Sequence, residues 1–323
     1  YDISLGLVGS EMCIRDSTMA HTSHTWRKLI TVTIACSLLT LTACAPPAIT
    51  NEKPTVLTTF TVLQDMAQNV AGNHLNVESL TKPGAEIHEY EPTPSDVKKA
   101  HDADLVLNNG LHLEAWFEQF MQDSEAKHVT VSDGVKPLSI SEDAASGTDN
   151  PHAWMSPRLA QTYVDNIARA FSELDPEHAE DFTKNANSYK QELQGIEQKL
   201  TQELSTLPEE HKALVTCEGA FSYLAQDAGL TEKYLWAVNS DSEVSAARLA
   251  EISDYVKDNK VPAVFCESTV SDASMQQVVS DAGTKFGGTL YVDSLSDEAG
   301  EVPTYLELLR HDTETISKGL SRK

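Results

Sequence analysis

The chain has 323 residues and is acidic, with 49 Asp and Glu against 24 Lys and Arg and a formal net charge of -25. Such a surface repels nucleic-acid phosphates and attracts cations, so a nucleic-acid partner is excluded from the expected functions. The chain is long enough for two domains. Its 40% of hydrophobic residues are typical of a globular protein and exclude a disordered chain, and its five cysteines are too few for a disulfide-rich scaffold.

The N-terminal segment is typical of an export signal. Arg27 and Lys28 precede an apolar run of about 13 residues, which is too short to span a bilayer as a helix. The run ends in Leu-Thr-Ala-Cys, which resembles the lipobox of bacterial lipoproteins. We therefore expect Cys44 to be acylated and to tether the chain to a membrane; the alternative is an ordinary signal with a chance cysteine.

Residues 1–18 lack the basic character of a signal start and resemble a spurious leader, so Met19 is the expected first residue of the natural chain. Residues 1–43 hold three basic and three acidic side chains, so their removal leaves the formal charge at -25. The negative charge therefore belongs to the folded part.

Strand-like and helix-like segments alternate through the rest of the chain, which predicts an α/β fold with mainly parallel sheets. In the first half, we expect strands or helices at 56–61, 62–70, 77–80, 93–101, 104–107 and 156–174. In the second half, we expect them at 213–217, 220–228, 246–257, 263–266, 271–282, 289–292 and 304–319.

Between these halves lies a long segment with apolar residues at helical intervals. It predicts a helix over about residues 176–207, either continuous or broken at Gly195. The expected organisation is a leader and signal peptide (1–43), a tether (44–54), an N-terminal lobe (55–175), the linking helix (176–207) and a C-terminal lobe (208–323).

Two cysteines remain once Cys44 and the leader are set aside. Cys217 and Cys266 lie in short apolar segments that could be neighbouring strands of one sheet. Because exported proteins favour disulfides, we expect a bond between them; two separate buried thiols are the alternative.

The common enzyme motifs are absent from the sequence. It contains no Gly-x-Ser-x-Gly, no phosphate-binding Gly-x-x-x-x-Gly-Lys, no His-Glu-x-x-His and no Cys-x-x-Cys. His112 and Glu114 have the His-x-Glu spacing of a zinc deaminase without its cysteines, so they are interpreted as part of a surface turn.

Four metal-competent side chains lie just after predicted strands or before a helix: His88, His152, Glu218 and Asp293. Ligands of open α/β sheets bind beyond the carboxyl ends of strands, so Glu218 and Asp293 could face one crevice. Taken singly, each residue also has a structural explanation, such as a cap or a turn. The other histidines of the mature chain are expected on the surface: His74, His101, His112, His128, His178, His211 and His311.

Four motifs occur together around these residues: His-Glu-Tyr-Glu-Pro-x-Pro-x-Asp from His88, Asn-Pro-His-Ala-Trp around His152, Glu-Gly-Ala-Phe from Glu218, and the strand end at Asp293. In this order and spacing they resemble the metal-binding lipoproteins of bacterial ABC transporters for manganese, zinc or iron (cluster A-I, ZnuA- and TroA-like). The resemblance covers about residues 54–320. It departs at 236–248, where the family often has a Gly-Thr-Pro turn.

The resemblance implies two α/β lobes joined by a long rigid helix, with one divalent metal ion held in the cleft between them by His88, His152, Glu218 and Asp293. It also implies that the chain is not an enzyme and delivers its metal to a permease with its ATPase. We expect a monomer located outside the cytoplasm, in the periplasm or on the outer face of the cytoplasmic membrane, attached to the membrane through Cys44.

The donor set favours a hard divalent cation. Two carboxylates and two neutral imidazoles balance the +2 charge, and carboxylates suit Mn²⁺ or Fe²⁺ better than a nitrogen- or sulfur-rich zinc site would. The segment 139–150 also lacks the histidine-rich loop that zinc-type relatives often carry. We therefore expect Mn²⁺ first, Fe²⁺ second and Zn²⁺ third. A secreted metal-dependent hydrolase and a surface adhesin with a structural metal are the alternative functions.

Overall fold

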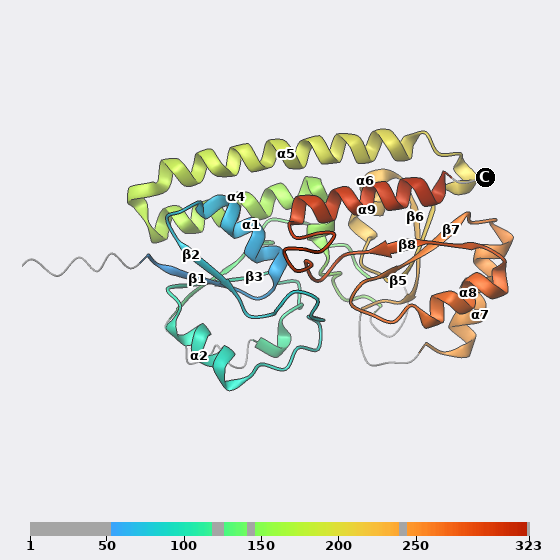
Figure 1. The fold of residues 1–323 in the computed structure, drawn as a ribbon, viewed down its shortest axis with the longest axis horizontal. Coiled ribbons are helices and arrows are strands. Elements are labelled where there is room, and N and C mark those ends of the chain that lie inside the picture. The colour runs from blue at the N-terminus through green and yellow to red at the C-terminus, as the bar shows by residue number, and fades with distance from the viewer. Residues whose placement is uncertain (1–52, 118–125, 141–145, 239–243, 322–323) are drawn as a thin grey trace, which may run out of the picture. The chain divides into compact units, whose positions relative to one another are not determined.

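Strands and helices alternate along the chain, as the sequence predicts (Figure 1). The computed structural model describes residues 53–117, 126–140, 146–238 and 244–321. The expected signal peptide, its basic residues and Cys44 lie outside these ranges. Among the described helices, none is both long and apolar enough to cross a membrane.

The N-terminal lobe is built on a four-stranded, fully parallel sheet of order β2-β1-β3-β4. Its strands are β1 (Thr55–Thr58), β2 (Asn76–Ser79), β3 (Leu105–Asn108) and β4 (Lys127–Thr130). In a parallel sheet all strands end at the same edge, so the loops that follow β1, β2 and β3 leave from one side.

Three helices pack with this sheet: α1 (Thr61–Ala71), α2 (Pro94–Asp102) and α4 (Pro157–Leu174). The start of α2 is fixed as predicted, because the Thr93 hydroxyl accepts from the Asp96 N–H and the Asp96 carboxylate accepts from the Thr93 N–H. At the start of α4, the Ser156 hydroxyl accepts from the Leu159 N–H at 3.1 Å. A short 3₁₀ turn, η1 (Ala153–Met155), comes directly before α4.

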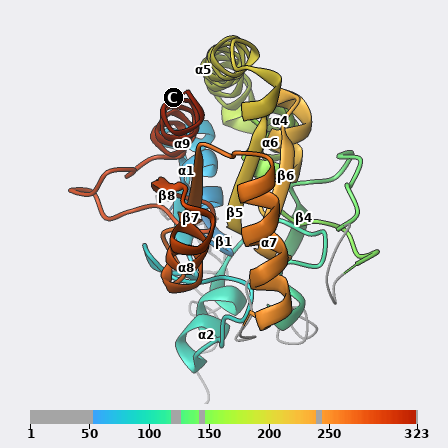
Figure 2. The same ribbon diagram turned by 90° about the vertical axis from the view of Figure 1, so that its right-hand side faces the viewer.

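The long helix α5 (Ala179–Ser205) is continuous through Gly195. Gly195 is exposed, and an added Cβ would meet no atom within 4 Å, so the glycine weakens the helix only by its backbone freedom. The helix begins later than predicted because residues 176–178 form a 3₁₀ turn, η2 (Pro176–His178). Figures 1 and 2 show α5 gathered with α4 and α9 on one side of the strands.

The C-terminal lobe contains two parallel strand pairs, β5–β6 and β7–β8. Its strands are β5 (Ala213–Glu218), β6 (Thr231–Trp236), β7 (Ala263–Glu267) and β8 (Lys285–Leu290). Its helices are α6 (Ser222–Ala228), α7 (Ala246–Asp258), α8 (Ala273–Ala282) and α9 (Tyr305–Leu320), and the 3₁₀ turn η3 (Glu209–His211) precedes β5.

Three strands differ from the sequence prediction. Strands β4 and β6 were not predicted, because β4 has no buried residue and β6 carries two charged residues in its first half. Strand β8 lies earlier than the predicted 289–292 because it runs through Gly287 and Gly288, which have low strand propensity. An added Cβ at Gly287 would come within 2.3 Å of the Phe265 ring, so the close packing of β8 on Phe265 requires glycine there.

A disulfide joins Cys217 to Cys266, with their Cα atoms 4.8 Å apart. The expectation that their strands belong to one sheet is wrong in one respect: among the described residues, β5 pairs with β6 and β7 pairs with β8, and no backbone ladder joins β5 to β7. The strands nevertheless lie side by side. The disulfide therefore ties the two strand pairs at a seam without backbone pairing.

Loss of this disulfide should destabilise the protein. The bond closes a separation of 49 residues, for which chain-entropy arguments give about 4 kcal/mol of stabilisation. We expect the Cys217→Ala/Cys266→Ala double variant to lose about 2–4 kcal/mol of unfolding free energy in urea titrations. A dithiol reductant should lower the wild-type midpoint and leave that of the double variant unchanged. Two free thiols in the non-reduced wild-type protein would contradict this prediction.

Candidate functional site

The four sequence-predicted ligands lie together, and their donor atoms are all within 4.8 Å of one another. His88 follows β2 and His152 precedes η1, whereas Glu218 is the last residue of β5 and Asp293 follows β8. The side chains of His152, Glu218 and Asp293 are fully buried, and that of His88 is 6% exposed. Residues up to 205 positions apart in the sequence therefore form one enclosed cluster.

The spacing of the donor atoms matches that around a metal ion. The Nε2 atom of His88 lies 3.1 Å from Nε2 of His152, 3.2 Å from Oε1 of Glu218 and 3.7 Å from Oδ1 of Asp293. Nε2 of His152 lies 3.4 Å from the same Glu218 oxygen and 3.9 Å from the same Asp293 oxygen. A tetrahedral site with bonds of about 2.0–2.2 Å requires donor separations of about 3.4 Å.

Side-chain hydrogen bonds to backbone groups hold the loop that carries His88. Oε1 of Glu86 accepts hydrogen bonds from the N–H groups of Ile87 and His88, both at 2.8 Å. The indole N–H of Trp116 donates to the Ile87 carbonyl at 2.9 Å. These contacts fix the backbone next to His88 and therefore the position from which its side chain projects.

His152 is oriented by its neighbours in the same motif. Oδ1 of Asn150 lies 3.0 Å from the His152 backbone N–H nitrogen and 2.8 Å from its Nδ1 atom. The Nε2 atom is thereby turned toward the other ligands. The indole N–H of Trp154 donates to the Val292 carbonyl at 3.1 Å, which brings this loop beside Asp293.

The two carboxylates of the C-terminal lobe are also supported. The Glu218 N–H donates to Oε2 of Glu267 at 3.0 Å. The hydroxyl of Thr269 donates to Oδ2 of Asp293 at 3.3 Å, which leaves Oδ1 as the oxygen facing the imidazoles. Supporting contacts of this kind hold metal ligands in orientation.

The loop before His88 is bonded directly to the loop after Asp293. The Gly84 N–H lies 2.7 Å from the Ser294 hydroxyl and 3.2 Å from the Leu295 carbonyl, and donates to both. The Leu295 N–H donates in turn to the hydroxyl of Thr61 at 2.9 Å. The lobes thus meet at the same place where their ligands converge.

Electrostatics couple the ligands to one another. Burial by itself lowers the pKa of His88, but the charges of Glu218 and Asp293 more than offset it, so the pKa of His88 lies well above its usual value. Burial by itself raises the pKa of Glu218, but the two imidazoles lower it further than burial raises it. The two imidazoles and the two carboxylates of this cluster therefore interact strongly with one another.

Two further acids near the cluster behave differently. Burial raises the pKa of Glu86 to about 7, and the charge of Asp293 adds to this rise. Burial also raises the pKa of Glu267 well above the usual value, and the charge of Glu218 adds to it. For both acids, burial and the charge of a neighbouring carboxylate therefore disfavour the ionised form.

The remaining metal-competent groups do not form a comparable site in the described part of the chain. Cys217, Cys266 and Glu267 also lie close together, but the two sulfurs are bonded to each other. The seven histidines expected on the surface are all partly or fully exposed. Glu114 is buried and accepts from the backbone N–H groups of Asn109 and Gly110, so it anchors the turn that contains His112.

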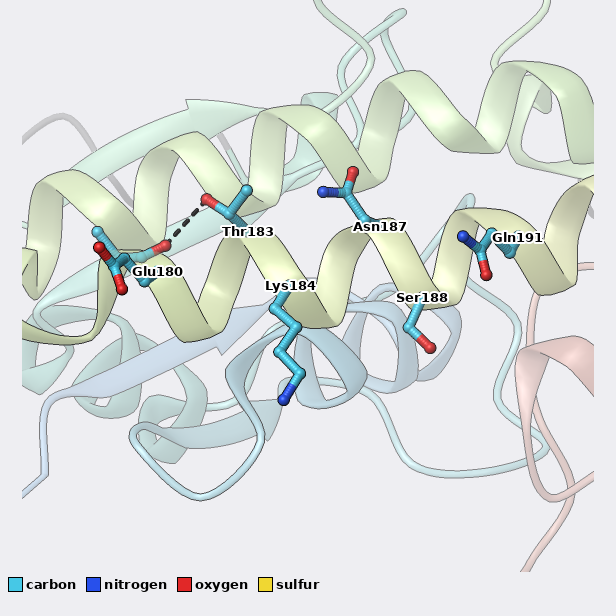
Figure 3. Close-up of a pocket in the computed structure, with 7 residues that line it drawn as sticks. Glu180, Thr183, Lys184, Asn187, Ser188 and Gln191 are labelled. Atoms are coloured by element: carbon cyan, nitrogen blue, oxygen red, sulfur yellow. Dashed lines mark hydrogen bonds between the residues drawn. The ribbon is translucent and has the colours of Figure 1, made fainter.

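A hollow of about 650 Å³ lies along the outer face of α5; Figure 3 draws the side chains that line it. Its walls come from this one helix and consist mainly of neutral polar side chains, with one carboxylate from Glu180 and one amine from Lys184. Side chains that fan outward from a single helix do not converge on a small ion. The hollow therefore does not compete with the four-residue cluster as a metal site.

Sequence reasoning did not identify the residues that support the ligands. Thr61, Trp116, Thr269, Ser294 and Glu267 all act through contacts with residues far away in the sequence. The motif around His152 contains Asn150 and Trp154, but the motif alone assigns no role to either residue. Only their position beside His152 could have indicated that they orient it.

The comparisons with known proteins identify the family of this chain. Residues 56–319 match the family model described as the periplasmic zinc-uptake complex component A, ZnuA. The chain is 46% identical over 297 residues to the iron-binding protein YfeA of Yersinia pestis, covering 91% of this chain and 96% of that protein. It is 34% identical to the manganese-binding lipoprotein MntA of Halalkalibacterium halodurans, covering 83% of this chain and 88% of that protein.

Solved structures show the same fold. A Mn-bound periplasmic metal-binding protein from Candidatus Liberibacter asiaticus is 37% identical, with a TM-score of 0.78, and covers 83% of this chain and 100% of its own. The periplasmic zinc-binding protein TroA from Treponema pallidum is 28% identical, with a TM-score of 0.78. The match covers 84% of this chain and 100% of the TroA chain. The chain therefore belongs to the ZnuA family of metal-binding substrate-binding proteins of bacterial ABC transporters, which are transport proteins and not enzymes.

Proposed function

We propose that this protein captures one divalent transition-metal ion between its lobes and delivers it to an ABC permease and its ATPase for uptake. The observation that carries the proposal is the convergence of two imidazoles and two carboxylates, in which each imidazole nitrogen lies 3.1–3.9 Å from the other donor atoms. His88, His152, Glu218 and Asp293 would hold the ion, each through one donor atom facing the centre. Their two negative charges cancel those of the cation, so the loaded site buries no net charge.

We favour Mn²⁺ as the transported ion, followed by Fe²⁺ and then Zn²⁺. Carboxylate oxygens make up half of the donor set, which suits the harder ions. The names of relatives support both leading candidates, because MntA is described as manganese-binding and YfeA as iron-binding. In a test tube, Zn²⁺ can still bind more tightly by the Irving–Williams order, so cellular supply is part of the selectivity.

The proposal places the protein outside the cytoplasm, as a monomer anchored to a membrane through acylated Cys44. Relatives whose names describe them as lipoproteins support the anchor. An adhesin with a structural metal is less favoured, because the matching family consists of uptake components. A hydrolase is not supported, since the family members are transport proteins and the ligand cluster already contains four protein donors.

The metal content of protein purified without chelator tests this function. From cells grown with equal Mn²⁺, Fe²⁺ and Zn²⁺, we expect elemental analysis to find about one ion per chain, with manganese the most abundant. Deletion of the gene should lower the cellular content of the same metal. Protein without metal, together with unchanged cellular metal content, would contradict uptake.

Removal of one carboxylate should abolish metal retention without unfolding the protein. Asp293 lies in a loop after β8, and Asp293→Ala would leave the proposed metal site with only one carboxylate. We expect a loss of at least about 100-fold in affinity, because a direct ligand matters more than the supporting contacts whose loss costs about 10–100-fold. Asp297→Ala, an exposed acid four residues later, is the matched control and should retain the metal.

Metal affinity should fall as the pH is lowered. Because the pKa of His88 is raised by Glu218 and Asp293, protons begin to compete with the metal above pH 6.5, the usual value for histidine. For each displaced proton, affinity should fall by about tenfold per pH unit. Competition titrations against a chromophoric chelator between pH 8.5 and pH 5 measure this slope; a flat profile would be incompatible with a two-imidazole site.

A further inference from the structure

Asn150 contacts groups on both sides of the cluster, although it is not one of the four ligands. It is 1% exposed and lies two residues before His152. Its Oδ1 atom faces the His152 ring, and its Nδ2 atom donates to the Gly219 carbonyl at 2.7 Å and to the Ser222 hydroxyl at 3.1 Å. Gly219 directly follows the ligand Glu218, so one side chain links the backbone beside two ligands from different lobes.

The direction of these hydrogen bonds is settled by a third residue. The Ser222 hydroxyl donates to Oε2 of Glu232 at 2.5 Å, so it can only accept from Asn150. The Gly219 carbonyl is also an acceptor. The amide nitrogen of Asn150 must therefore face Gly219 and Ser222, which leaves the amide oxygen facing His152.

This direction determines the tautomer of His152. An amide oxygen only accepts hydrogen bonds, so the Nδ1 atom of His152, 2.8 Å away, must carry the hydrogen. In a neutral imidazole the other nitrogen, Nε2, then holds the lone pair. Nε2 is the atom that faces His88, Glu218 and Asp293.

We infer that Asn150 is a positioning residue that holds His152 in its metal-binding tautomer and ties it to the turn beside Glu218. The inference rests on the proposed metal-binding function but assigns a role to a residue outside the ligand set. The carboxylate of Glu232, which also accepts from the Phe221 N–H at 2.9 Å, is the fixed end of the chain that runs through Ser222 and Asn150 to the imidazole.

Asn150→Ala and Asn150→Asp separate the two contacts of the amide. Alanine removes both the acceptor and the donors, whereas aspartate keeps an acceptor for Nδ1–H and loses the donors to Gly219 and Ser222. The matched control is Asn166→Ala: Asn166 is also buried and donates to two carbonyls, those of Val131 and Asp133, but contacts no ligand.

The first readout is the ring ¹⁵N spectrum of the metal-free full chain at alkaline pH, with His152 assigned by its loss in His152→Gln. We expect a single Nδ1–H tautomer in the wild type, Asn150→Asp and Asn166→Ala, and a mixture in Asn150→Ala. An Nε2–H tautomer in the wild type or in Asn150→Asp would overturn the inference. The aspartate variant keeps the test decisive if the alanine variant does not fold.

The second readout is Mn²⁺ affinity from chelator competition. Asn150→Ala should bind about 10–100-fold more weakly, as for other contacts that orient metal ligands, and Asn166→Ala should match the wild type. Affinity of Asn150→Ala within about twofold of the wild type, or an equal loss in Asn166→Ala, would refute the positioning role. If the wild type itself bound no metal, the proposed function would fail while the tautomer readout would still stand.

Discussion

The main physical constraint in this structure is the burial of two carboxylates opposite two imidazoles. Glu218 and Asp293 are fully buried, and two such charges close together are costly unless opposite charge compensates them. Burial by itself lowers the pKa of His88, but the charges of Glu218 and Asp293 raise it well above its usual value. In the proposed function, a divalent cation would balance the charges of both carboxylates completely.

The parallel topology explains how distant residues reach this point. Parallel strands of one sheet end at a common edge. Three of the candidate ligands lie at such strand ends, although in three different sheets: His88 follows β2, Glu218 ends β5 and Asp293 follows β8. The fine placement then comes from contacts between the lobes. Gly84 with Ser294, Trp154 with Val292 and Asn150 with Gly219 each join a segment next to one ligand to a segment next to another.

Much of the fold could be predicted from local sequence signals. The cap at Thr93 and the apolar spacing within α5 depend on neighbouring residues, and the structure agrees with both. Strand β4 could not be recognised, because an exposed edge strand has no alternating apolar pattern. Strand β8 was predicted too late in the sequence, because it contains two glycines of low strand propensity, of which Gly287 is required by the packing on Phe265. The four ligands carried a positional signal, but their supporting residues Thr269 and Trp116 act only through tertiary contacts.

The seam in the C-terminal lobe connects the fold to the site. Strands β5 and β7 lack a backbone ladder. Besides their shared hydrophobic core, they are joined by the bond between Cys217 and Cys266 and by the hydrogen bond from the Glu218 N–H to Glu267. Each cysteine directly precedes one of these acids in the sequence. Because Glu218 belongs to one strand pair and Asp293 follows the other, the distance between the two carboxylate ligands depends on how firmly this seam is closed. A covalent bond at that position fixes the separation without placing any side chain inside the metal site.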